Sequence, residues 1–250
     1  MRRRNLPRLT NVFLPVMGTA LLTVAVGCAR TKPAPAPPAV VAVAPPAAEK
    51  PAAPPPEPLK KGEVLLFNGK DLAGWKIVNT ADFARHGKVY AADGQLMLSQ
   101  GDPMTGIQWA GDFPTDNYEV TLEAMRVTGD DFFCGMTFPV AKSYCTLIVG
   151  GWGGNVVGLS NVDGENASEN QTTTGKSFDK DRWYRLRLRL TTAKIEVWID
   201  QEQVIDLERG THKFDVWLEQ QPITPFGVAT WNSGGALRNF RLRRIEAEGE

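Results

Sequence analysis

The chain has 250 residues and a formal net charge of zero, with 28 basic and 28 acidic side chains. This balance argues against a nucleic-acid partner, because binding to phosphates requires a basic surface. Seven tryptophans and eleven phenylalanines are ample for a core, so the composition predicts one large globular domain with appendages.

The first appendage is a targeting segment over residues 1–28. A basic stretch, MRRRNLPRLTN, precedes a short apolar stretch, VFLPVMGTALLTVAV, and the segment ends in AVGC at Cys28. Such a short apolar stretch is typical of a signal peptide rather than of a membrane-spanning helix. The ending resembles the bacterial lipobox. That resemblance implies lipidation of Cys28 and an exported protein held on the cell envelope, in the outer membrane of a two-membrane cell, by its lipid anchor only. The alternative is an ordinary cleaved signal peptide with an incidental cysteine.

The second appendage is a linker over residues 29–60, rich in proline and alanine. Proline has no amide donor and favours the extended polyproline II conformation, so this segment cannot build a core. We expect a disordered, semi-rigid spacer.

Residues 61–250 are predicted to form one all-β domain. Apolar and polar residues alternate in NYEVTLEAM (117–125), RWYRLRLRL (182–190) and KIEVWID (194–200), which indicates strands with one buried face. In VYAADGQLML (89–98), Asp-Gly between two apolar runs predicts a hairpin. A short helix or turn is expected near KFDVWLEQQ (213–221). Many antiparallel strands with almost no helix favour a β-sandwich or jelly roll.

One polar strand face allows two interpretations. Arg185, Arg187 and Arg189 share a face, which either pairs with glutamates of neighbouring strands or grips an anionic substrate. Trp198 is out of phase with the buried residues of its strand and points with the charges. It is a candidate for stacking on a sugar ring, or it is covered by a neighbouring segment.

At Val64–Lys76 the sequence VLLFNGKDLAGWK resembles the opening motif of the 3-keto-disaccharide hydrolase domain family. DGQLML, NYEVTLEAM and ALRNFRLRRI follow in the family's order, so the resemblance covers nearly all of Glu63–Glu246. It implies a concanavalin- or laminin-G-like sandwich, export as a lipoprotein, and cleavage of glycosidic bonds in 3-keto sugars. In physical terms the motif is structural, since Asn68-Gly69 suits a tight turn and Trp75 suits the core. The middle of the domain lacks the family's commoner Asn-Ser-Gly pattern, which indicates a divergent branch.

Cys134 and Cys145 lie in two neighbouring predicted strands. A hairpin that closes on Pro139-Val140 places them opposite one another and predicts a cross-strand disulfide, which export permits. The alternative is two reduced, buried thiols. No zinc site is expected, because neither histidine, His86 or His212, keeps a ligand spacing to the cysteines. Each histidine is a general base or an ordinary surface residue.

The candidate site lies in VGGWGGNVVGLSNVDGENASENQTTTGK, residues 149–176. Its glycines allow close approach to a ligand, and its tryptophan, amides and carboxylates are the groups that a sugar site uses. Two carboxylates supply the acid and base of glycoside cleavage, so Asp163 and Glu169 are the predicted catalytic residues. The predicted sugar-binding residues are Trp152, Asn155, Glu165, Asn166, Asn170 and Trp198.

No cofactor is expected, although Ca²⁺ suits this oxygen-rich loop, which has no EF-hand pattern. A polar loop without a site is the alternative interpretation. The predicted partner is a carbohydrate, cleaved by hydrolysis, or by elimination and hydration. A non-catalytic carbohydrate-binding module and a cell-envelope interaction module are the alternative functions.

Overall fold

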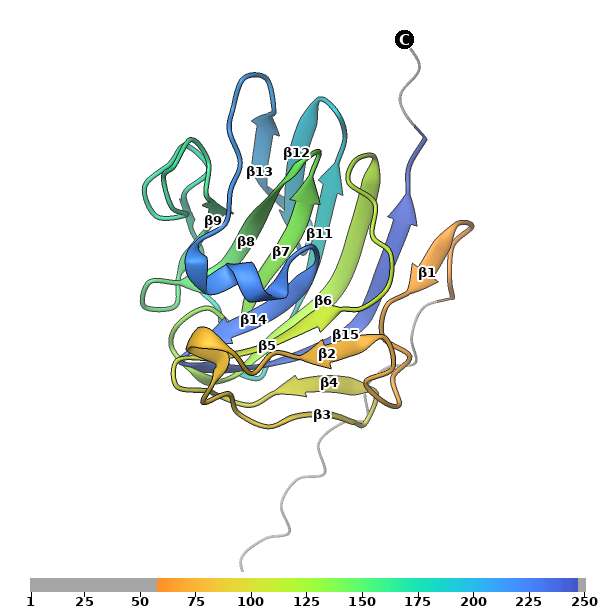
Figure 1. Cartoon of the computed structure of the whole chain (residues 1–250), viewed down its shortest axis with the longest axis vertical. Coiled ribbons are helices and arrows are strands. Elements are labelled where there is room, and N and C mark those ends of the chain that lie inside the picture. Colours follow the sequence, from red (N-terminus) through yellow and green to blue (C-terminus); the bar gives the residue numbers. More distant parts are fainter. Residues whose placement is uncertain (1–57, 247–250) are drawn as a thin grey trace, which may run out of the picture. The chain divides into compact units, whose positions relative to one another are not determined.

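Residues 58–246 are described by the computed structural model, and they form two antiparallel sheets packed face to face (Figure 1). Sheet A has eight strands in the order β13-β12-β11-β6-β15-β4-β3, and β1 also pairs with β15. Its strands are β1 (Glu63–Leu65), β3 (Val89–Ala92), β4 (Gln95–Leu98), β6 (Tyr118–Gly129), β11 (Trp183–Leu190), β12 (Lys194–Ile199), β13 (Glu202–Glu208) and β15 (Ser233–Arg244).

Sheet B has seven strands in the order β10-β9-β8-β7-β14-β5-β2. Its strands are β2 (Trp75–Ile77), β5 (Met104–Trp109), β7 (Cys134–Val140), β8 (Ser143–Gly151), β9 (Val156–Ser160), β10 (Thr174–Gly175) and β14 (Gly227–Trp231). Two short 3-10 helices, η1 (Ala81–Phe83) and η2 (Leu218–Ile223), accompany the sheets. The all-β sandwich is therefore confirmed, and so is the short helix expected near residues 213–221.

No helix between residues 58 and 246 is long and apolar enough to cross a membrane. The predicted signal peptide, with Cys28, and nearly all of the predicted linker fall outside the described residues.

The main core lies between the sheets and follows the predicted alternation. Tyr118, Leu122, Tyr184 and Leu186 of β6 and β11 are at most 1% exposed and belong to one apolar cluster. The hairpin predicted at residues 89–98 forms between β3 and β4. Burial of such side chains is the dominant stabilising term of the domain.

The family's opening motif has the structural role expected from its residues. The side-chain oxygen of Asn68 accepts hydrogen bonds from the amides of Lys70 (2.8 Å) and Asp71 (3.0 Å), and Gly69 has a φ of +78°. Trp75 is 7% exposed, and its indole N–H donates to the carbonyl of Leu66 at 2.7 Å. The motif therefore anchors the start of the sandwich.

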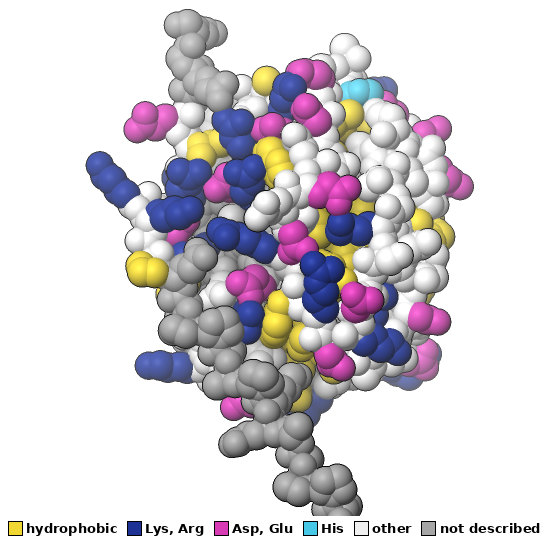
Figure 2. All heavy atoms as spheres, turned by 180° about the vertical axis from the view of Figure 1, so that it is seen from behind, with side chains coloured by type: hydrophobic (Ala, Val, Ile, Leu, Met, Phe, Trp, Pro, Cys, Tyr) yellow, Lys and Arg dark blue, Asp and Glu magenta, His cyan; other side chains and the backbone are white. Residues whose placement is uncertain are grey.

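The outer face of sheet A is a network of ion pairs. Arg187 lies 3.8 Å from Glu119, and Arg189 lies 2.9 Å from Glu196, so the predicted arginine–glutamate pairing is confirmed. Figure 2, the view from behind Figure 1, shows acidic and basic side chains interspersed over this face. The described chain also begins on this side, where Arg241 of β15 donates to the carbonyl of Pro58 at 3.1 Å.

The outer face of sheet B carries a second, smaller apolar cluster. Phe83 of η1, Ile223 of η2 and Ala167 of the segment after β9 are fully buried over strand residues such as Met104 and Ala229. Short helices and loops thus cover part of this face. Such partial covering leaves room for a hollow beside the covered part.

The predicted cross-strand disulfide is wrong, because Cys134 and Cys145 are both free and buried. The turn of the β7–β8 hairpin lies two residues later than predicted, at Ala141-Lys142, with Val140 opposite Ser143. In this register Cys134 faces Val149 and Cys145 faces Phe138, so the sulfurs are not cross-strand partners. Burial raises the pKa of the Cys134 thiol to about 12 and raises that of Cys145 further, so both behave as small apolar side chains.

Candidate functional site

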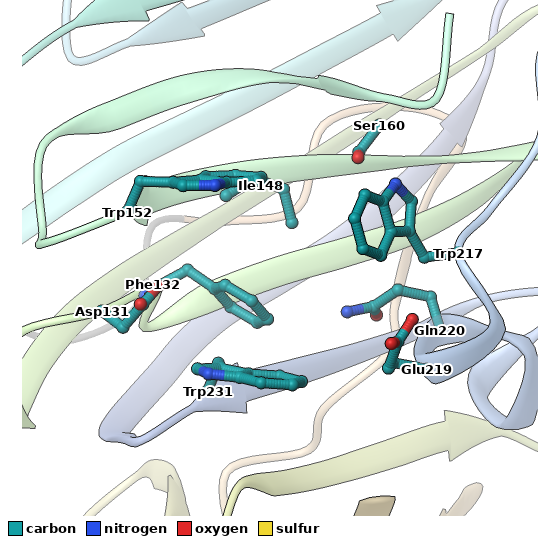
Figure 3. A pocket seen from close by; sticks show the side chains of 9 residues that line it. All are labelled: Asp131, Phe132, Ile148, Trp152, Ser160, Trp217, Glu219, Gln220 and Trp231. Carbon is teal, nitrogen blue, oxygen red and sulfur yellow. The ribbon is translucent and has the colours of Figure 1, made fainter. Parts of the chain in front are cut away.

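A pocket opens on the outer face of sheet B, beside the smaller apolar cluster. Its cavity volume is about 240 Å³. The lining comes from the segment before β7, from β8 and β9, from the turn between them, from the region of η2, and from the end of β14. The lining residues are Asp131, Phe132, Ile148, Trp152, Ser160, Trp217, Glu219, Gln220 and Trp231 (Figure 3).

Tryptophans dominate the pocket. Trp152 and Trp217 are 45% and 44% exposed, which is unusual for such large apolar side chains. Trp231 is partly buried, and its ring lies 6.3 Å from that of Phe132. Exposed indoles around a hollow are typical of sites that bind flat, partly apolar molecules, including sugar rings.

Two carboxylates lie at opposite ends of the aromatic floor (Figure 3). Asp131 is at one end, and burial raises the pKa of its carboxyl despite hydrogen bonds from the backbone amides of Phe132 and Trp152, which lower it. Glu219 is at the other end, beside Gln220. Gln220 is 5% exposed, and its side-chain oxygen is buried without a hydrogen-bond partner among residues 58–246. Its amide nitrogen points into the pocket, where it can donate to an oxygen of a ligand (Figure 3).

Arg126 of β6 fixes two of the segments that line the pocket. Its guanidinium is 5% exposed and donates to the carbonyls of Gly150 (3.1 Å), Gly154 (2.8 Å) and Asp131 (3.3 Å). The first two carbonyls flank the turn that carries Trp152. One buried cation therefore holds the Trp152 turn and the Asp131 segment together.

The wall formed by Trp217 is supported by the loop that follows β9. The indole N–H of Trp217 donates to the side-chain oxygen of Asn161. The amide of Asn161 donates to the carbonyl of Asp215 at 2.6 Å, and the reverse bond measures 3.3 Å. Val162 and Phe214 extend this pairing as an isolated bridge.

Of the residues predicted in the 149–176 stretch, Trp152 lines the pocket. Asp163 does not; it is exposed and accepts hydrogen bonds from His212 Nδ1 (2.6 Å) and from the amide of Lys213 (2.8 Å). The Lys213 amide, and then the His212 contact, hold the pKa of Asp163 below its usual value. Asp163 thus ties the loop after β9 to the segment before η2.

The remaining polar residues of the stretch shape the loop and lie outside the pocket lining. The Asn170 amide donates to the carbonyls of Leu159, Glu165 and Asn166, and the Asn166 amide donates to the carboxylate of Glu169. Asn155 accepts the amide of Lys176 through its backbone carbonyl at 2.8 Å. The structure therefore does not bring Glu165 or Glu169 together with Trp152.

Trp198 lies on the other side of the sandwich, on the outer face of sheet A. The guanidinium of Arg187 lies 3.6 Å from its ring centroid, in a cation–π contact. Trp198 borders a charged hollow of about 570 Å³ that is also lined by Glu119 and Arg243. This hollow is separated from the tryptophan pocket by the whole sandwich.

Within residues 58–246, no group of three or more His, Cys, Asp or Glu side chains is arranged to hold a metal ion.

The fold agrees with the comparisons to known proteins. Residues 62–243 match the sequence profile of the 3-keto-alpha-glucoside-1,2-lyase-like domain. The chain belongs to this family. The family expected from the motif at Val64–Lys76 is thus confirmed, and the domain is one of a carbohydrate-active family. No curated protein matches the chain.

Solved structures show the same fold at low sequence identity. A glycosyl hydrolase-like protein from Parabacteroides distasonis has a TM-score of 0.50 at 15% identity, covering 74% of this chain and 95% of that protein. The Crh5 transglycosylase in complex with NAG has a TM-score of 0.51 at 14% identity, covering 80% of this chain and 90% of that protein.

Sequence reasoning missed most of the pocket, namely Asp131, Trp217, Glu219, Gln220 and Trp231. One signal was available. Trp231 falls out of phase with the buried Val228 of its strand, so it had to lie on the outer face of sheet B. The same argument placed Trp198 correctly on an outer face.

Proposed function

We propose that this protein cleaves glycosides of 3-keto sugars, such as 3-keto-disaccharides, in the tryptophan-lined pocket. The observation that carries the proposal is the pair of carboxylates, Asp131 and Glu219, at opposite ends of an aromatic floor in a domain of this family. Glycoside cleavage commonly uses two carboxyl groups, one as acid and one as base.

The ketone makes the cleavage an elimination. A base removes the proton from C2, which the C3 ketone acidifies, and the electron pair forms the C1=C2 double bond. The C1–O bond breaks as the leaving oxygen takes a proton from the acid. The products are an enone and an alcohol, and addition of water to the enone completes a net hydrolysis.

The environments of the carboxylates suggest their roles. The raised pKa of Asp131 favours its protonated form, which suits the acid that protonates the leaving oxygen. Glu219 then takes the part of the base. Gln220 contributes an amide that orients a sugar hydroxyl or the ketone oxygen.

The two-sheet domain lies within residues 51–250, and these residues are the part to assay. With 3-keto-trehalose, we expect release of glucose together with enone absorbance. Asp131→Asn and Glu219→Gln should each lower kcat by about a hundredfold or more, with an unchanged circular dichroism spectrum. Trp198→Ala, on the opposite sheet, is the matched control and should retain turnover.

Absence of turnover with every 3-keto sugar would contradict the proposal. Sugar binding without turnover would instead identify a carbohydrate-binding module, and neither binding nor turnover would leave an envelope interaction module. We further propose that the protein is exported and lipid-anchored through Cys28, on the sequence pattern of residues 1–28.

A further inference from the structure

The pocket has an apolar half and a polar end (Figure 3). Phe132, Ile148, Trp152 and Trp231 form the apolar half. Glu219 and Gln220 lie together at the other end, beneath Trp217. The ligand of this pocket should have the same division, since buried groups are stable only against groups of like polarity.

A sugar ring fits the apolar half poorly. Each of its hydroxyls requires a hydrogen-bond partner once it leaves water, and an unpaired one is destabilising. Asp131 is the acid group at this side, and one of its oxygens already accepts the amide of Phe132 at 2.7 Å. The Ser160 hydroxyl is also engaged, with the Asn161 side chain (3.2 Å) and the Ala167 amide (3.3 Å).

A flat apolar ring fits the same half well. Indole and phenyl faces attract aromatic rings in stacked and edge-to-face arrangements. The whole pocket, apolar half and polar end together, has a cavity volume of about 240 Å³, compared with the roughly 150 Å³ that encloses a benzene molecule in an engineered protein cavity, so a single ring fits within it.

The polar end suits the sugar. The side-chain amide nitrogen of Gln220 points into the pocket, and Glu219 lies beside it (Figure 3). The amide can donate hydrogen bonds to sugar oxygens, the carboxylate can accept them from sugar hydroxyls, and the exposed face of Trp217 offers a surface to the sugar's C–H groups.

We propose that the apolar half binds the leaving group, and that the preferred substrates are 3-keto glycosides of an aromatic or similarly flat apolar alcohol rather than disaccharides. The inference rests on the proposed function for its chemistry. In this arrangement Asp131 lies on the leaving-group side, where the acid is required, and Glu219 lies on the sugar side, where the base is required.

The test compares benzyl and methyl 3-keto-glucosides with the full-length protein. Benzyl alcohol and methanol are alcohols of similar acidity and therefore similar leaving groups. A difference in rate between the two glycosides thus reports the binding of the benzyl ring rather than the ease with which the alcohol leaves. We expect kcat/KM for the benzyl glycoside to be at least about tenfold higher, as one apolar group in a fitted pocket gives about 10–200-fold. The 3-keto-disaccharide should resemble the methyl glycoside.

Trp231→Ala should lower kcat/KM for the benzyl glycoside more than for the methyl glycoside, so that the ratio of benzyl to methyl kcat/KM falls close to one. Trp198→Ala is the control and should keep the ratio. If Trp231→Ala does not fold, inhibition of the wild-type protein by benzyl alcohol and by glucose replaces it, and benzyl alcohol should inhibit more strongly.

Equal kcat/KM for benzyl and methyl glycosides, with both cleaved, overturns this inference and leaves the proposed function intact. Without any cleavage the proposed function fails, and quenching of tryptophan fluorescence by benzyl and methyl glucosides then decides the inference. Tighter binding of the benzyl compound supports it, and equal binding or none overturns it.

Discussion

Arg126→Met tests whether one buried cation assembles the pocket. The guanidinium donates to three carbonyls of the pocket segments and to Phe178 at 3.3 Å, and it is 5% exposed. Methionine fills a similar volume but donates no hydrogen bond. The variant therefore loses the two shortest of these four hydrogen bonds, which are those to the carbonyls of Gly150 and Gly154.

The expected loss in the free energy of unfolding follows from these two bonds. Hydrogen bonds that involve a charged group contribute about 1.5–3 kcal/mol each. Two of them give about 3–6 kcal/mol, and relief from burying a charge offsets part of this. We expect a net loss of about 3 kcal/mol, which corresponds to a fall in Tm of about 6–12 °C for a domain of this size.

Thermal unfolding of residues 51–250 measures this loss. Arg85→Met is the matched control, because the Arg85–Asp102 pair, at 2.9 Å, is exposed on both sides and such pairs contribute about 0–1 kcal/mol. The freed Trp152 turn should also raise KM more than it lowers kcat. A Tm within about 2 °C of wild type would refute the assignment of Arg126 as the residue that holds the pocket together.

Three further predictions concern Asp131, Asp163 and Cys28. Turnover that needs protonated Asp131 should fall as pH rises through the elevated pKa of Asp131, and a pH–rate profile of Asp131→Asn should lack this fall. Asp163→Ala should retain turnover, since Asp163 lies outside the pocket; loss of turnover in a folded variant would restore the role expected from sequence. Cys28→Ser should move the protein from the membrane fraction to the soluble fraction, and continued membrane association would rule out the lipid anchor.

The sandwich was predictable because its signal is local. In β6, β11 and β12, each strand carries its own alternation of apolar and polar residues, and the buried face follows directly. The family motif adds a tight turn that depends on neighbouring residues only, and a tryptophan, Trp75, that packs against Trp109, Phe226 and Phe240.

The pocket was not predictable in the same way because its residues come from distant segments. Asp131, Trp152, Trp217 and Trp231 meet only after two sheets and a 3-10 helix are in place. The loop after β9 misled the prediction for a related reason. Asparagine amides suit sugar hydroxyls and backbone carbonyls equally, and Asn170 binds three carbonyls.

The error at the cysteines came from the turn. The β7–β8 hairpin turns at Ala141-Lys142, and Ala141 adopts a φ of +53°, a conformation that alanine seldom takes. Neither Pro139-Val140 nor Ala141-Lys142 contains the glycine or asparagine that marks a two-residue turn, so sequence rules do not locate this turn. A small displacement of the turn changes every cross-strand pair.

The position of Pro58 has a practical consequence for handling the protein. Its carbonyl is bound by Arg241 on the sheet A side, whereas the tryptophan pocket opens on sheet B. A sensor chip or bead coupled upstream of Pro58 would therefore meet the ion-paired side first. Immobilisation through the N-terminal end should leave the pocket facing the flowing solution, and coupling through Lys213, in the segment that leads to Trp217, should not.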